Sequence, residues 1–311
     1  MTRTLLALPI LLVTGCALPP NPPFVSWLPT HQVNVAHRGG ASSGPENTIR
    51  AIQRSQEPSI ESEIVEIDLH SSADDVIVVI HDKTVDRTTG TGLGCSIPQD
   101  TVSETFGEVR VRDLTVAELQ ELDAGACYTT EEGARPFAGE GVTIPTLRET
   151  LTAFPTLRFM LEIKQTEPSI VPQLLDLVVE LDALDRSCFL AFDEGATQEL
   201  AELGPEGTCV SMPSSGIRCW STEGLFPFGG GGCPAYDVMW MPHTNSGLNL
   251  KSERIVSNIQ NAGMPVFMWT INDAETMQEA LNAGVDGVIT DRPDILRDLL
   301  GRPGIGAPDI Q

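Results

Sequence analysis

Apolar runs alternate with amphipathic stretches along most of the chain. Short runs rich in β-branched and aromatic residues are typical of buried strands, and apolar residues spaced three and four apart are typical of helices. The predicted strands are 33–36, 63–69, 157–164, 188–192, 208–212, 236–241, 265–271 and 286–291. The predicted helices are 49–56, 115–124, 146–154, 169–184, 194–203, 249–262, 273–283 and 293–300.

This alternation predicts an α/β fold. Strands separated by amphipathic helices form parallel β/α units, and eight such units favour a closed (β/α)8 TIM barrel. A doubly wound open sheet is the alternative, but no Gly-x-Gly-x-x-Gly follows the first strand to suggest a dinucleotide site. We therefore expect a barrel domain over 33–300, followed by a tail at 301–311.

Two stretches interrupt the rhythm. Residues 82–143 have no clear period, and we expect them to form a long insertion on the rim of the barrel, after a hairpin that follows the second strand. Loops of that length are usually functional or disordered. Residues 213–235 are rich in Gly and Pro, and we interpret them as a loop.

The most informative stretch is EIVEIDLHSSADDVIVVIHD at 63–82. Glu66 and Asp68 are two apart, so on a strand their side chains share one face. Two carboxylates that close share a proton or a cation, and oxygen ligands suit a hard divalent metal. The turn before 76–80 is too short for a parallel crossover, so a hairpin returns His81 toward the carboxylates. A half-buried strand with a chance Glu-x-Asp is the alternative.

Polar residues also gather where the other predicted strands end, which is where a barrel places its active site. Because the strands are parallel, these residues should meet at one end of the barrel. Asp291 we interpret as a structural cap of the final loop. The set is His37 and Arg38, Glu66 and Asp68, Glu162 and Lys164, Trp269 and Asn272, and Asp291.

The N-terminus reads as a targeting segment. Arg3 precedes a short apolar run, LLALPILLV, which is too short to span a bilayer. The following Val-Thr-Gly-Cys resembles the lipobox of bacterial lipoproteins, so we expect a signal peptide at 1–15, a lipidated Cys16 and a Pro-rich tether over 16–32. The protein would then be exported and anchored in a membrane, on the periplasmic side or at the cell surface. An ordinary secretory signal with a chance cysteine is the alternative.

Six cysteines remain beyond Cys16, and an even number in an exported protein suggests disulfides. The sequence does not choose among the fifteen pairings that six cysteines allow. Nearness in the chain favours Cys95–Cys127, Cys188–Cys209 and Cys219–Cys233.

The balance of charged residues limits the kinds of molecule that the protein is expected to bind. With 43 acidic and 19 basic residues the formal net charge is −24, which disfavours nucleic acid and anionic membrane surfaces. An anionic substrate would then need a local source of positive charge. Such a surface suits small soluble substrates better than anionic lipid.

Five motifs, in order, give the chain its resemblance to a known family. AHRGG…PENT, EIDLH with VVIHD, LEIK, MWTIND and GVITDRPD resemble the glycerophosphodiester phosphodiesterase family over nearly the whole chain after residue 32. The resemblance implies a TIM barrel, a divalent metal such as Ca²⁺ or Mg²⁺, and hydrolysis of a small glycerophosphodiester to glycerol 3-phosphate and an alcohol. The long insertion with its cysteines departs from the pattern, so the resemblance leaves the preferred alcohol open.

The resemblance also implies roles for individual residues. The metal ligands would be Glu66, Asp68 and Glu162, and the acid/base pair would be His37 and His81. Arg38 and Lys164 would bind the phosphate, and Trp269 would pack against the glycerol. The chemistry fits these residue types, because cations can neutralise a phosphodiester while two histidines move protons at its attacking and leaving oxygens.

Two other functions stay open. A phospholipase D-like enzyme acting on lysophospholipids or sphingolipids would need an apolar groove, to which Phe106, Phe137, Phe226 and Phe228 could contribute. A surface lipoprotein that only binds a ligand would be expected to lack a histidine or carboxylate of the set, whereas this chain has all of them. The sequence indicates no protein partner.

Overall fold

The strands form a closed barrel. The computed structural model describes residues 21–92, 95, 108–223 and 232–301. The barrel strands are β1 (Val33–Ala36), β2 (Ile64–Ser71), β4 (Arg158–Ile163), β5 (Ser187–Leu190), β6 (Cys209–Val210), β7 (Met239–Pro242), β10 (Val266–Trp269) and β11 (Gly287–Thr290). They pair in parallel in the order β6-β5-β4-β2-β1-β11-β10-β7. A parallel bridge between Ser211 and Val238 joins β6 to β7 and completes the ring, which confirms the predicted (β/α)8 barrel.

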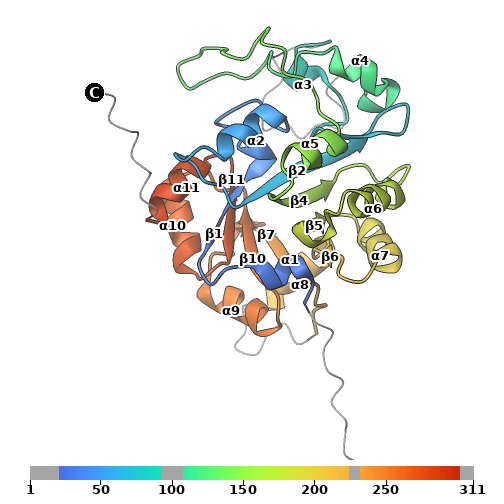
Figure 1. The fold of residues 1–311 in the computed structure, drawn as a ribbon. Coiled ribbons are helices and arrows are strands. Elements are labelled where there is room, and N and C mark those ends of the chain that lie inside the picture. The colour runs from blue at the N-terminus through green and yellow to red at the C-terminus, as the bar shows by residue number, and fades with distance from the viewer. Residues whose placement is uncertain (1–20, 93–94, 96–107, 224–231, 302–311) are drawn as a thin grey trace, which may run out of the picture.

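A helix follows each barrel strand and covers the outside of the barrel (Figure 1). Polar residues start several of them: Thr146 and Glu149 form a capping box, and Asp193 and Asp273 accept hydrogen bonds from backbone N–H groups of the first turn. These helices are α2 (Ile49–Ser55), α5 (Leu147–Ala153), α6 (Val171–Glu180), α7 (Glu194–Leu203), α8 (Ser214–Glu223), α9 (Glu253–Asn261), α10 (Ala274–Asn282) and α11 (Pro293–Leu299). Short elements complete the barrel domain: η1 (His37–Gly39), η4 (Leu184–Arg186), and the hairpin of β8 (Thr244–Asn245) with β9 (Leu248–Asn249).

The insertion forms a small unit at the end of the barrel where β2 ends. Its strand β3 (Ile77–Val79) pairs antiparallel with β2, as the predicted hairpin requires. The helices α3 (Asp86–Thr89), η3 (Val111–Asp113) and α4 (Val116–Gln120) follow, and α3 and α4 lie at the top of the view in Figure 1. Apolar residues from both sides of the insertion, among them Val78, Leu119 and Ile144, form a core of its own.

Two predictions about irregular segments are wrong. Residues 214–223, expected to be loop, form α8, because Ile217 and Trp220 lie on one helical face and are buried in the core. The tether expected over 16–32 is not extended throughout: Pro23–Trp27 form helix α1, and Phe24 is fully buried. Helix α1 contacts η4 and β6 and lies at the end of the barrel opposite the insertion.

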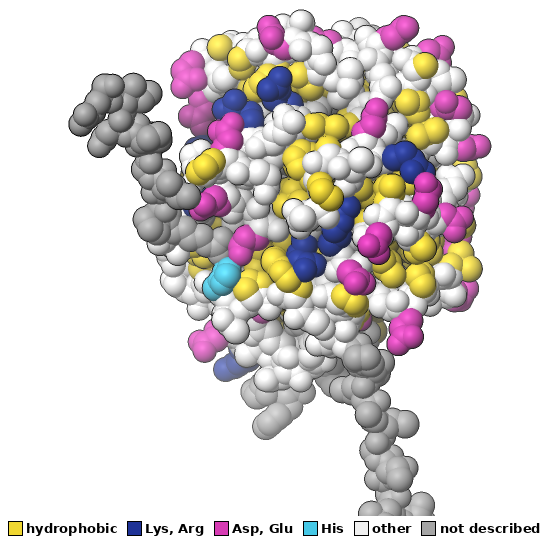
Figure 2. Space-filling view, viewed as in Figure 1, with side chains coloured by type: hydrophobic (Ala, Val, Ile, Leu, Met, Phe, Trp, Pro, Cys, Tyr) yellow, Lys and Arg dark blue, Asp and Glu magenta, His cyan; other side chains and the backbone are white. Residues whose placement is uncertain are grey.

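The three predicted disulfides are all present. Cys95–Cys127 lies within the insertion, Cys188–Cys209 joins β5 to β6, and Cys219–Cys233 links α8 to the segment before β7. Within the described ranges, no helix is both long and apolar enough to cross a membrane. Figure 2 shows acidic side chains spread over one face of the molecule, in keeping with the net charge.

Candidate active site

Three carboxylates meet at the end of β2 and β4. The two strands pair so that Asp68 lies beside Glu162, and Glu66 is two residues earlier on the same face of β2. Each residue offers an oxygen, and these three oxygens lie within 4.8 Å of one another. All three side chains are buried, so the predicted ligand set forms a single compact cluster.

The cluster holds buried carboxylate oxygens that its protein neighbours do not satisfy. Burial, together with the nearby carboxylate of Asp68, raises the pKa of Glu66 to about 8. Burial also raises the pKa of Glu162. Among the described residues, Glu66 Oε1 and Asp68 Oδ1 are buried with no hydrogen-bond partner. Buried oxygens without donors are costly, and a hard divalent ion satisfies such oxygens, so this donor set fits the metal that the sequence predicts.

Two side chains hold Asp68 in place. The Asn47 side-chain amide donates to Asp68 Oδ2 at 2.7 Å, and its oxygen accepts from the Asp68 backbone N–H at 3.1 Å. The Lys164 Nζ lies 3.5 Å from Asp68 Oδ1 and 2.6 Å from Glu162 Oε1. Although burial alone would raise the pKa of Asp68, the nearby His81, Lys164 and Arg38 lower it, so Asp68 is the anchor of negative charge in the cluster.

His37, at the end of β1, is held from the neighbouring strand β11. Its Nδ1 lies 2.6 Å from Asp291 Oδ1 at the end of β11, and its Nε2 lies 3.8 Å from Glu66 Oε2. The Asn272 side-chain amide donates to Asp291 Oδ2 at 2.7 Å. Burial opposes protonation, but the hydrogen bond to Asp291 and the negative charges of Asp291 and Glu66 together outweigh it, and the pKa of His37 is raised. Asp291 therefore orients His37 and does not cap the final loop, which corrects the sequence-based interpretation.

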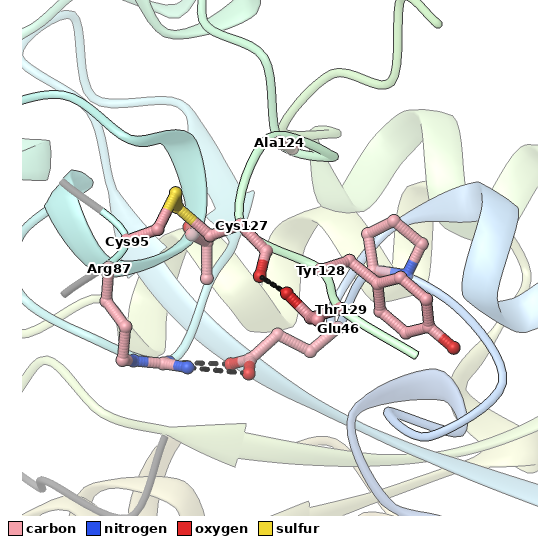
Figure 3. A pocket seen from close by; sticks show the side chains of 9 residues that line it. Glu46, Arg87, Cys95, Ala124, Cys127, Tyr128 and Thr129 are labelled. Atoms are coloured by element: carbon pink, nitrogen blue, oxygen red, sulfur yellow. Dashed lines mark hydrogen bonds and ion pairs between the residues drawn. A yellow bond between two sulfur atoms is a disulfide. The ribbon is translucent and has the colours of Figure 1, made fainter. Parts of the chain in front are cut away.

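His81 is held by its own neighbour. Its Nδ1 lies 2.7 Å from Asp82 Oδ1, and Arg87 donates to the same Asp82 carboxylate from Nε at 2.6 Å. Arg87 also forms a bidentate pair with Glu46, at 2.7 Å for both bonds, as the parallel dashed lines in Figure 3 show. Because Arg38 Nη1 donates to Glu46 at 3.0 Å, one chain of ion pairs links His81 to Arg38.

Arg38 is positioned by its backbone as well as by Glu46. It adopts a left-handed φ of 50°, which is uncommon for a residue other than glycine. This conformation lets its backbone N–H donate to Glu66 Oε2 at 2.8 Å, and its Nε lies 3.6 Å from Asp68 Oδ2. The predicted phosphate-binding arginine therefore touches the carboxylate cluster at two points.

An aromatic group lies beside the cluster. The ring of Trp269 lies 5.5 Å from the rings of both Phe192 and Trp240. Phe192 is 38% exposed and lines a cavity of about 240 Å³ together with His81, Glu162 and Lys164. Within the described ranges, the Trp269 indole N–H is buried with no acceptor. An apolar wall with a free donor therefore lies next to the charged site.

The structure thus brings together seven of the predicted site residues and connects the eighth, Trp269, through Phe192, while Cys16 and the signal peptide lie outside the described residues, as does the tail beyond residue 301. Sequence reasoning did not identify the residues that position the histidines, although Asp82 and Asp291 stand within motifs that it used. Their role is apparent only from the distance between each histidine and its carboxylate in the structure. Asp82, Arg87, Asn272 and Asp291 position the histidines, whereas Asn47 holds Asp68 and Glu46 bonds Arg38 and Arg87.

The fold and the site agree with what the chain is similar to. A model of the glycerophosphoryl diester phosphodiesterase family matches residues 37–201 and 233–295, which includes every barrel residue of the site. A curated glycerophosphodiester phosphodiesterase of Caldanaerobacter subterraneus is 28% identical over 282 residues, covering 87% of this chain and 98% of that protein. A human lysophospholipase D is 24% identical over 294 residues, covering 86% of this chain and 85% of that protein.

Solved structures give the same picture. A phosphodiesterase of Oleispira antarctica, solved in complex with its product sn-glycerol-3-phosphate, has a TM-score of 0.64 and 25% identity, and the match covers 89% of this chain and 98% of that chain. A glycerophosphoryl diester phosphodiesterase domain from Mycobacterium tuberculosis has a TM-score of 0.71 and 21% identity, with 88% of this chain and all of that chain covered.

Proposed function

The chain belongs to the glycerophosphodiester phosphodiesterase family, and we propose that it releases glycerol 3-phosphate from glycerophosphodiesters at the site built on Glu66, Asp68 and Glu162, with a divalent metal and two histidines. The enzyme class follows from the family and its curated members. The metal and the roles of individual residues are the proposed part.

Glu66, Asp68 and Glu162 would hold the ion, Ca²⁺ or Mg²⁺, since hard oxygen ligands suit both. When bound, the ion supplies positive charge that polarises the phosphoryl group. The support is the cluster itself, in which two buried carboxylate oxygens have no donor among the described residues.

Arg38 and Lys164 would bind the phosphate. Both stand at the edge of the carboxylate cluster, and Arg38 can offer a planar fork of donors while Lys164 adds a compact charge. Trp269, beside Phe192 and Trp240, would pack against the glycerol. Its unpaired indole N–H would then have a hydroxyl to bond.

His37 and His81 would divide the proton transfers between them. In each, Nδ1 faces a carboxylate, which fixes the ring and leaves Nε2 for the reaction. One histidine takes a proton from the attacking water, and the other gives a proton to the oxygen of the departing alcohol. The observation that carries the proposal is this pairing of two carboxylate-held histidines around one buried carboxylate cluster.

The test is release of glycerol 3-phosphate from glycerophosphocholine by purified protein, with Ca²⁺, with Mg²⁺ and with chelator. We expect metal-dependent release, lowered about 10³-fold in His37→Ala. His31→Ala is the matched control, because His31 also pairs with a carboxylate, Glu63, at 2.7 Å but lies at the surface. No release with either metal from folded protein would refute the proposal and leave a binding function.

Lysophospholipase D activity is the second candidate. The human relative carries that name, and the exposed ring of Phe192 gives the cavity an apolar side. Phe137, suggested from the sequence as a groove residue, packs edge-to-face on Tyr128, while Phe106, Phe226 and Phe228 lie outside the described residues. Lysophosphatidylcholine in the same assay distinguishes the two: a higher kcat/KM than for glycerophosphocholine would favour the second candidate.

Export and a lipid anchor at Cys16 complete the proposal. The support is the apolar N-terminal run with its lipobox-like cysteine, together with three disulfides that suit an oxidising compartment. In this arrangement residues 1–15 are removed and the chain before α1 connects the barrel to the membrane. Mass spectrometry of the mature protein from membranes would test it: an unmodified Cys16 would contradict the anchor.

A further inference from the structure

A second, larger cavity adjoins the candidate active site. Its volume is about 740 Å³, and it lies between the insertion and the loop after β4. It shares His70, Lys83, Lys164 and Thr166 with the smaller cavity that contains His81 and Glu162. The two cavities therefore meet around Lys164, and a molecule bound at the metal cluster can extend from one into the other.

The walls of this larger cavity are basic in a strongly acidic protein. Four of the 19 basic residues of the chain line it, against one acidic residue, Glu167. Three of the four, Lys83, Arg110 and Arg112, belong to the insertion and are not part of the proposed catalytic set. A local excess of positive charge on a chain of net charge −24 needs a reason, and an anionic ligand provides one.

The basic side chains stand on ordered backbone. Arg110 pairs with Thr84 in an antiparallel bridge, and Arg112 donates to the Ser71 hydroxyl at 2.8 Å and lies 2.5 Å from Asp75. Arg112 is therefore already neutralised in part, and Arg110 and Lys83 both lie at the exposed mouth of the cavity. A ligand entering the cavity would meet these two cations first.

The position of the aromatic residues indicates which cavity receives which end of the substrate. Phe192, which touches Trp269, lines only the smaller cavity, whereas Arg110 and Arg112 line only the larger one; Lys83 lines both. With glycerol packed against Trp269, the departing alcohol points toward Lys83 and Arg110. His81 lines the smaller cavity, and its carbonyl oxygen bonds the ring of His70, which lines both cavities.

We propose that the larger cavity binds the departing alcohol and selects glycerophosphodiesters whose alcohol carries a further negative charge, such as a second phosphate group. This inference rests on the proposed function, and it assigns the substrate class of the same site. Water adds to phosphorus and loses a proton to His37, the bond from phosphorus to the alcohol oxygen breaks, and His81 protonates that oxygen. Glycerol 3-phosphate and an anionic alcohol leave.

The test compares three diesters that differ in the charge of the departing alcohol. Bis(glycerophospho)glycerol carries a second phosphodiester there, glycerophosphoglycerol is neutral, and glycerophosphocholine is cationic. We expect kcat/KM for the first to exceed that for the second about tenfold, the effect of one hydrogen bond to a charged group. Since the first probe has two equivalent ends, a twofold ratio counts as no preference. Raising the salt from about 0.05 M to about 0.5 M should shrink the ratio.

Variants locate the effect. Arg110→Gln should reduce the ratio toward two, mainly through KM, and Arg110→Lys should retain part of it. Arg218→Gln, which removes an exposed arginine on α8, is the charge-matched control and should keep the ratio of the unmodified protein. A ratio of kcat/KM values near two in the unmodified protein, or a ratio that is unchanged in Arg110→Gln, overturns the inference. In either case, release from all three diesters leaves the proposed function standing. Release from none of them overturns both.

Discussion

The two histidines of the site are held in the same way by different parts of the molecule. His37 and His81 each face a carboxylate, at 2.6 Å and 2.7 Å. The carboxylate of His37 comes from the far end of the chain, on β11, and is steadied by a neutral amide. That of His81 is the next residue, and it is steadied by Arg87 in an ion-pair chain that runs through Glu46 to Arg38.

The two carboxylates differ in what their contacts do besides orienting a histidine. Barrel closure brings Asp291 to His37, so that support serves orientation alone. Arg87 is buried and holds two carboxylates, so the support of His81 also binds the insertion to the loop after β1. Changes near His37 should therefore alter catalysis with little effect on stability, whereas changes near His81 should alter both.

The largest effect should come from Asp291→Asn. The amide cannot hold His37 in the same tautomer, so kcat should fall about 10³-fold, somewhat less than the roughly 10⁴-fold loss when the carboxylate of a serine-protease triad is replaced. KM and the melting temperature should stay close to those of the unmodified protein. Steady-state kinetics and a thermal melt measure both, and a kcat within tenfold would show that Asp291 does not orient the histidine.

Arg87→Gln should reduce stability most. It takes the bidentate arginine from Glu46, which keeps only Arg38, and the only arginine bonded to Asp82 among the described residues, which keeps only His81; breaking buried pairs in this way costs about 3–5 kcal/mol. Although burial alone would raise the pKa of both carboxyls, Arg38 and Arg87 lower that of Glu46, and His81 and Arg87 lower that of Asp82, so the variant removes part of that stabilisation. Urea unfolding monitored by circular dichroism gives the free energy of unfolding.

Arg148→Gln is the matched control for Arg87→Gln. Arg148 also bonds a glutamate with both Nη atoms, but the two side chains are half exposed, so the loss should stay below about 1 kcal/mol. Equal losses in the two variants would mean that the ion-pair chain contributes no more than a surface pair.

Metal binding to the carboxylate cluster should stabilise the folded protein. Glu66, one of the proposed ligands, lies 3.8 Å from the imidazole of His37. At a metal concentration 100 times Kd, the free energy of unfolding should rise by about 2.7 kcal/mol. Thermal melts with Ca²⁺, Mg²⁺ and chelator measure the shift. Glu162→Gln should abolish it, and a shift of the same size in that variant would place the ion elsewhere.

The smallest effect should come from Asn272→Ala. This change removes the amide that donates to Asp291 Oδ2 but leaves the bond between Asp291 and His37 intact. It also removes the bonds that Asn272 Oδ1 accepts from the Asp291 backbone N–H and from Thr290 Oγ1, but only one of the three lost bonds reaches the carboxylate, so kcat should fall about tenfold. If kcat instead fell as far as in Asp291→Asn, the amide would be as important as the carboxylate for placing His37.

The sequence predicts the parts of this molecule that depend on periodicity and strand ends. Because parallel strands share one direction, polar residues after β1, β2, β4, β10 and β11 had to meet at one end of the barrel, and they do. The register that sets Asp68 beside Glu162 is visible only in the structure.

The sequence does not predict interactions that depend on how the insertion folds back. Arg87 and Glu46 are 41 residues apart, and only the tertiary structure brings them together. Helix α8 was missed for a related reason: its glycine and flanking prolines favour a loop locally, and burial of Trp220 against the core outweighs that tendency.

The seam of the barrel, where β6 meets β7, affects how the barrel remains closed. Strand β6 has two residues, and an isolated bridge joins it to β7. One disulfide attaches β6 to β5, and another attaches α8, which follows β6, to the segment just before β7. These covalent links keep the two edges at a high effective concentration, so an opened seam closes again as an intramolecular event. The ring depends on its crosslinks most where its hydrogen bonds are fewest, which couples oxidation of the chain to closure of the barrel.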